Sequence, residues 1–187
     1  MTGVVAVYGA YQGLQSARRS RFILRISPVV LKFRPGQFDH INKLVGAGQK
    51  VDGQYFRYRM DIEMYNSGLG SGSVAKPRLI IEQRNRPPWT WHKHRPIVLE
   101  PETEHWEMER ESPNVTSHTK VREGKSYRLG PGGSQDDELI YQVKEAADIQ
   151  LCAKFHPELS YKAMFTDNQG RKRLVTITKF EEGEEYF

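Results

Sequence analysis

The sequence predicts a mainly all-β fold, an antiparallel β-sandwich with a short N-terminal helix and one further short helix possible. Apolar and polar residues alternate over residues 55–65, as in a strand with one wet face. Short apolar runs follow, separated by Gly, Pro and Asn turns, and the chain closes with a hairpin pattern. A length of 187 residues fits one domain. We divide it into an N-terminal helical segment (1–20), a β-sandwich (21–180) and an acidic tail (181–187).

The N-terminal segment is apolar over residues 3–11 and basic at Arg18, Arg19 and Arg21. No positive region precedes the apolar run, which is unlike a signal peptide, and the run is too short for a complete membrane span. Two interpretations remain open. The segment is the last part of a membrane helix with its basic end on the cytoplasmic side, or an amphipathic helix packed on the domain or on a partner.

The strands expected in the first half of the domain are short. Residues 22–26 and 29–33 form an edge or bent strand that Pro28 interrupts. The alternating residues 55–65 form the clearest strand, and residues 78–82 and 96–100 form two more. Residues 116–121 alternate only weakly.

The second half contains one ambiguous element. Residues 126–129 form a strand before a glycine-rich turn, after which Ser134 resembles a helix N-cap followed by acidic residues. The pattern predicts a helix from Ser134 to Ala147, with a strand over residues 139–143 as the alternative. Residues 159–165 and 171–180 form the closing hairpin around a turn at residues 167–170.

Three of these features together resemble a known family. Asn66-Ser67-Gly68, the small residues through Ala75 and the run Leu79-Ile80-Ile81 resemble immunoglobulin-like adhesion-type domains of the CARDB kind. The hairpin at residues 161–171 and the basic-ended segment before the β domain are similar to uncharacterised bacterial membrane-tethered proteins. The resemblance implies an immunoglobulin-like sandwich. That group shares no catalytic residues, so no catalytic residue is expected here.

The composition narrows the class of protein further. A single cysteine, Cys152, excludes an intrachain disulfide and thus a disulfide-stapled secreted module, so a cytoplasmic or membrane-associated location is favoured. We interpret Cys152 as a small buried hydrophobic residue, because a nucleophile needs a nearby base and His156 is near it only in sequence.

The most unusual segment covers residues 84–96, which hold two of the three tryptophans, two histidines and four cations. Its three prolines disfavour a helix or an inner strand, so we expect a loop or an edge. Three interpretations of this segment remain open. It contacts a ligand or nucleic acid by stacking, it forms a protein interface, or its tryptophans fold back over the end of the sandwich. The predicted contact residues are Arg84, Arg86, Trp89, Trp91, Lys93 and Arg95.

His92 and His94 also form a His-x-His pair, which on a strand places both rings on one face. Glu100 or His105 could supply a third metal ligand, and the chain would then be a metal-dependent β-fold enzyme. The neighbouring cations oppose metal binding, so we expect neither metal nor cofactor. The acidic residues 100–111 are expected to form a solvated face.

The net charge of +5 first suggests a nucleic-acid-binding domain, which we keep as the alternative function. The charge is divided into blocks, however. Residues 1–59 and 76–95 are basic, whereas residues 100–111 and the tail are acidic. Such a bipolar chain favours contacts with a protein partner, a second copy or a membrane surface, and indicates no small-molecule ligand. The sequence therefore predicts a non-enzymatic binding or scaffold domain.

Overall fold

The structure is a computed structural model, and it describes residues 12–13, 21–34, 36–49, 56–84, 95–102, 104–112, 115–122 and 125–182. The predicted helical segment therefore lies outside the described residues except for residues 12–13. The last five residues of the predicted tail also lie outside them. Glu181 and Glu182 are described, and they belong to a strand.

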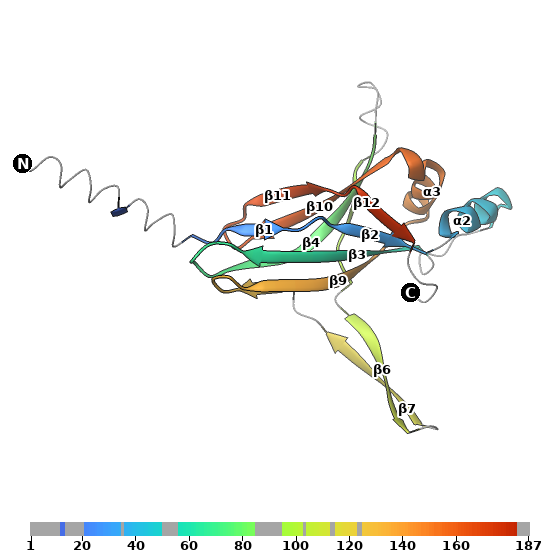
Figure 1. Cartoon of the computed structure of the whole chain (residues 1–187). Helices are drawn as coiled ribbons and strands as arrows, with labels where there is room; N and C mark the ends of the chain where they lie inside the picture. Colours follow the sequence, from blue (N-terminus) through green and yellow to red (C-terminus); the bar gives the residue numbers. More distant parts are fainter. Residues whose placement is uncertain are drawn as a thin grey trace, which may run out of the picture.

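Two five-stranded sheets form the main body of the described part of the domain, which confirms the predicted mainly β sandwich (Figure 1). The first sheet has the order β1-β3-β2-β12, with β9 also paired to β3. Its strands are β1 (Leu24–Ile26), β2 (Val30–Phe33), β3 (Arg57–Asn66), β9 (Ser134–Gln142) and β12 (Lys179–Glu182). The pairing is antiparallel except between β12 and β2.

The second sheet has the order β11-β10-β4-β5, with β8 paired to the other end of β4. Its strands are β4 (Gly72–Gln83), β5 (Ile97–Leu99), β8 (Ser126–Leu129), β10 (Leu159–Asp167) and β11 (Lys172–Thr176). The predicted closing hairpin is the β10–β11 pair, in which Lys162 lies opposite Thr176. This sheet is antiparallel throughout its described pairs.

The core lies between the two sheets and follows from the alternation seen in the sequence. In β3, Tyr58, Met60, Ile62 and Met64 are buried while the intervening residues are more exposed. In β10, alternate residues from Leu159 to Phe165 are buried in the same way. Period-two burial of this kind places one apolar face of each sheet against the other.

The prediction of a helix from Ser134 to Ala147 is wrong, because residues 134–142 form strand β9, paired with β3 along its length. The alternative prediction, a strand over residues 139–143, agrees better with the structure, since Leu139, Tyr141 and Val143 are buried in alternation. Pairing with a long inner strand outweighs a local N-cap signal. The helix α3 (Ala146–Phe155) begins only after this strand.

A further helix, α2 (Gln37–Gly46), follows β2 and was not predicted. It packs against α3, where the Asn42 side-chain amide donates a hydrogen bond to the Ala153 carbonyl at 3.4 Å. Both helices lie at the same end of the sandwich (Figure 1). We call this the helical end.

Strands β6 (Glu104–Ser112) and β7 (Val115–Arg122) form a separate antiparallel hairpin that projects from the sandwich (Figure 1). The weak alternation at residues 116–121 thus corresponds to a real strand. Most of the acidic block lies in β6, with Glu104 opposite Arg122. In the described part of the chain, no helix is long and apolar enough to cross a membrane.

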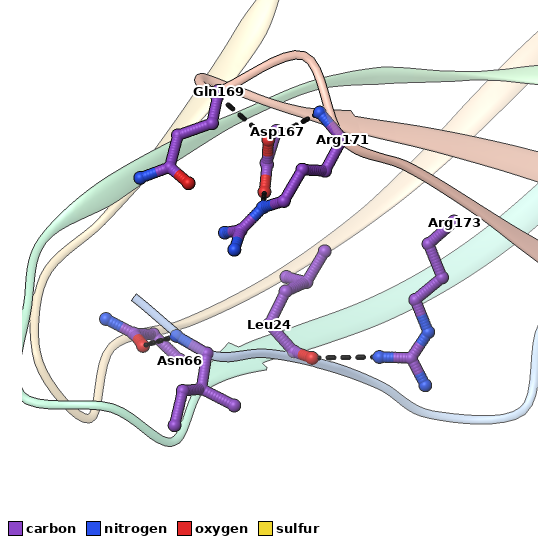
Figure 2. A network of polar contacts seen from close by, with 7 residues as sticks. Leu24, Asn66, Asp167, Gln169, Arg171 and Arg173 are labelled. Carbon is purple, nitrogen blue, oxygen red and sulfur yellow. Dashed lines mark hydrogen bonds and ion pairs between the residues drawn. The ribbon is translucent and has the colours of Figure 1, made fainter. Parts of the chain in front are cut away.

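The end opposite the helices is held together by one buried side chain, Asn66, at the end of β3. Its side-chain oxygen accepts hydrogen bonds from the backbone N–H groups of Ile23 at 3.1 Å and Gly68 at 3.0 Å. Its side-chain nitrogen donates to the carbonyls of Gly70 at 2.7 Å and Gly130 at 2.9 Å. The bond to the Ile23 N–H is visible in Figure 2. One amide therefore joins the start of β1 to two separate turns.

We predict that Asn66→Ala lowers the free energy of unfolding by about 3 kcal/mol, because it removes four hydrogen bonds between one buried amide and backbone groups that are partly or fully buried. Chemical denaturation of both proteins measures the difference. The neighbouring exposed Ser67→Ala is the control and should change stability by no more than about 0.5 kcal/mol. A loss below about 1 kcal/mol in Asn66→Ala would contradict this role.

Candidate functional site

Of the predicted contact residues, the structure describes Arg84 and Arg95, and both are exposed. Ile81 of β4 pairs with Ile97 of β5, so this register brings Arg84 and Arg95 to the same end of the second sheet. The Arg84 N–H donates a hydrogen bond to the Glu158 carbonyl at 2.7 Å, which fixes the backbone there. The remaining predicted contact residues and the histidine pair lie outside the described residues, namely Arg86, Trp89, Trp91, Lys93, His92 and His94.

A groove with a volume of about 910 Å³ lies between β5 and α3, and Arg95 lines it. We call it the α3–β5 groove. Val98, which is 48% exposed, faces solvent here, and Leu151 and Phe155 add apolar surface from α3.

Charges of both signs surround the α3–β5 groove. Lys144 and Lys154 are basic, while Glu145 and Asp148 are acidic. Burial, together with the charge of Glu145, raises the pKa of Asp148 above its usual value. Apolar surface with a rim of mixed charge suits a polypeptide better than a strongly anionic ligand.

A second set of reactive groups, Cys152, Tyr58, Tyr161 and His156, lies inside the helical end. The Cys152 side chain hydrogen-bonds to Tyr58, whose hydroxyl oxygen lies 3.4 Å from that of Tyr161. The Tyr161 hydroxyl in turn lies 3.0 Å from Nδ1 of His156. The ring of His156 stacks on Phe38 of α2 with centroids 3.6 Å apart. The structure thus connects Cys152 to His156 through two buried tyrosines.

These groups are buried or half-buried in the packed interior of the helical end. Cys152 is fully buried, which confirms its interpretation as a small interior residue. Burial raises the pKa of the Cys152 thiol to about 12, so the reactive thiolate is scarce at neutral pH. Burial also raises the pKa of Tyr58 well above its usual value. Among the described residues, no group of three or more His, Cys, Asp or Glu side chains is placed to hold a metal ion.

A third feature lies at the other end of the sandwich, where the chain enters the domain. A groove of about 530 Å³ is lined by Phe22, Leu24 and Phe165 and by four cations, which are Arg21, Arg171, Lys172 and Arg173. Figure 2 shows how two of these cations are held. The Arg171 guanidinium pairs with Asp167 at 2.6 Å, and the Arg173 guanidinium donates to the Leu24 carbonyl at 2.9 Å.

Asp167 is itself fixed by several donors. Burial opposes its ionisation, but hydrogen bonds from the Arg171 side chain and from the backbone N–H groups of Arg171 and Gln169 lower its pKa overall. Sequence reasoning missed this basic site. The triplet Arg171-Lys172-Arg173 after a turn was its only local signal, because Arg21 is distant in the sequence.

Comparison with known proteins adds little to these observations. No family model and no curated protein matches the chain. Among solved structures, the chain is similar to a putative ApaA protein from Bordetella pertussis, with 13% identity and a TM-score of 0.35 over 85% of this chain and 91% of that one. A FixG-related protein from Vibrio parahaemolyticus gives 10% identity and a TM-score of 0.34 over 85% and 95%. Likenesses at this level carry no argument about function.

The half-buried His156 gives a testable pH dependence. Burial lowers its pKa below the ordinary 6.5, so the unfolded chain binds the proton more readily than the folded one. Its contribution to stability is complete above about 6.5 and declines as the pH falls below that value. We predict that His156→Phe, which keeps an aromatic ring on Phe38, reduces the loss of melting temperature between neutral pH and pH of about 5.5.

The control is His40→Gln on the exposed side of α2, which should retain the pH dependence of the native chain. Thermal melts at both pH values measure the effect. Identical pH dependence in His156→Phe and the native chain would show that His156 does not contribute.

Proposed function

We propose that this protein is a non-enzymatic binding or scaffold domain that contacts a protein partner through residues 84–95 and the adjacent α3–β5 groove. The observation that carries the proposal is the position of that groove. Arg95 and Pro96, the last two residues of the tryptophan-rich segment (residues 84–96), both belong to the lining. A ligand in the groove would therefore be close to the part of the sequence with the strongest composition for an interface.

The chemistry of the groove supports a protein rather than a small substrate. Exposed Val98 offers an apolar anchor, and cations and carboxylates both line the same groove. Interfaces commonly combine an apolar centre with a charged rim that selects the partner. Tryptophan and arginine, both present in residues 84–95, are the residues that most often dominate binding energy.

The non-enzymatic part of the proposal rests on the reactive groups near the groove. Cys152 and Tyr58 are fully buried and Tyr161 almost so, which leaves them without access to a substrate. His156 is half-buried by aromatic rings rather than placed beside an exposed nucleophile. These observations favour a packing role for all four residues.

We predict that affinity purification of the full chain from its native source recovers a protein partner that is lost from two separate variants. One is Trp89→Ala combined with Trp91→Ala, and the other is Val98→Arg, which places a charge on the apolar part of the groove. Mass spectrometry of the bound proteins measures the loss, expected to be at least about tenfold for a central anchor.

Leu174→Arg is the matched control, because Leu174 is an exposed apolar residue on β11, away from α3. It should retain the same partner. Retention of every bound protein by both test variants would end the proposal for this surface.

A further inference from the structure

We propose that the end of the sandwich opposite the helices docks on a bilayer surface that carries anionic lipids. We call it the entry end and define it as residues 21–24, the turn at residues 67–71, the turn at residues 167–171 and the start of β11. This contact is separate from the proposed protein contact and rests on different residues.

The parts of the entry end are fixed to one another by backbone hydrogen bonds. The Ser67 N–H donates to the Ile23 carbonyl at 2.9 Å, and the Gly70 N–H donates to the Arg21 carbonyl at 3.3 Å. The Asn168 N–H donates to the Ser73 carbonyl at 2.9 Å, which attaches the second turn to the start of β4. The turns therefore form one surface rather than independent loops.

That surface is positively charged. Arg21, Arg171, Lys172 and Arg173 are all exposed and line one groove. Asp167 is the carboxylate in that groove, and it already pairs with Arg171 at 2.6 Å. The lining of this groove holds no second carboxylate that could pair with Arg21, Lys172 or Arg173. Clusters of cations near a membrane are attracted by the negative surface potential of anionic lipids.

Aliphatic side chains project beside these cations. Leu69, at the tip of the turn after β3, is 63% exposed, and Ile23 is 40% exposed. Exposed aliphatic residues next to cations match a bilayer surface, where the apolar groups enter the headgroup region and the cations meet phosphates. The aromatic rings that line the groove, Phe22 and Phe165, pack against the core, whereas stacking on nucleic-acid bases requires exposed rings.

The sequence before Arg21 also combines apolar residues with cations. The apolar residues 3–11 reach the domain through Arg18, Arg19 and Arg21. Only residues 12–20 separate the apolar run from Arg21 of the entry end, so a bilayer that takes up the run would be tethered near that end.

The distribution of acids favours end-on docking. The outer face of β3 and β9 carries Asp61, Glu63, Asp136 and Glu138, of which Asp61 and Glu138 pair with Lys32 and Arg59. Glu63 and Asp136 form no ion pair among the residues that the structure describes, and they would repel an anionic bilayer. The basic entry end is therefore the part of the sandwich whose charge best complements an anionic bilayer.

The test is co-sedimentation of the full chain with vesicles of phosphatidylcholine alone or with about 30% phosphatidylserine, enough to make the surface clearly negative. We expect binding only to the anionic vesicles, weakened by added salt. Arg21→Glu combined with Lys172→Glu should reduce the affinity at least about tenfold. Leu69→Ser should reduce it several-fold without changing the salt dependence.

The matched control reverses two exposed cations at the helical end that line neither groove, Arg34→Glu with Lys43→Glu, and should bind as the native chain does. Thermal melts establish that every variant is folded. Equal binding by both double variants, or equal binding to neutral vesicles, would overturn the proposal. So would a charge-dependent mobility shift with duplex DNA in the absence of vesicle binding, which would assign the surface to nucleic acid.

Discussion

The arrangement of the entry end depends on the burial of a single amide. The Asn66 side chain has no solvent exposure, and it donates two hydrogen bonds to backbone carbonyls and accepts two from backbone N–H groups. Its own backbone adds bonds to the turn at residues 130–133. The turn after it also needs Gly68, since a Cβ atom there would lie 1.9 Å from the Arg21 carbonyl oxygen. Hydrogen bonds to these groups from within the protein allow the loops to pack closely.

The two sheets are connected inside the sandwich by polar contacts as well as by apolar packing. Lys76 of β4 is 8% exposed and pairs with Asp137 of β9 at 3.6 Å. The Tyr127 hydroxyl also donates to Asp137, and the Tyr141 hydroxyl donates to the Pro77 carbonyl at 2.6 Å. Because such bonds have preferred geometry, they fix the position of one sheet over the other more strictly than apolar contact does. A fixed sandwich keeps the surfaces at its two ends in constant relative positions.

Much of the β framework could be predicted from local patterns, whereas the candidate sites could not. The alternation in residues 56–64 and the hairpin turn at residues 167–170 are local signals, and both elements form as expected. Residues 134–138 carried a local helix signal, but pairing with β3 determined their structure instead. The basic groove joins Arg21 to Arg173 across most of the chain. Its formation depends on the pairing of distant strands, which no local pattern encodes.

The position of the two proposed contacts follows from the lengths of the central strands. β3 and β4 contain 10 and 12 residues, and each spans the sandwich between the entry end and the helical end. A strand of that length spans about 35 Å, so a bilayer at one end would leave the α3–β5 groove clear of the membrane surface. The antiparallel pairing of β4 with β10 extends along most of both strands and resists bending. The sandwich would therefore hold a protein partner at a set height above the lipid headgroups, which is a mechanical role that requires no catalytic residue.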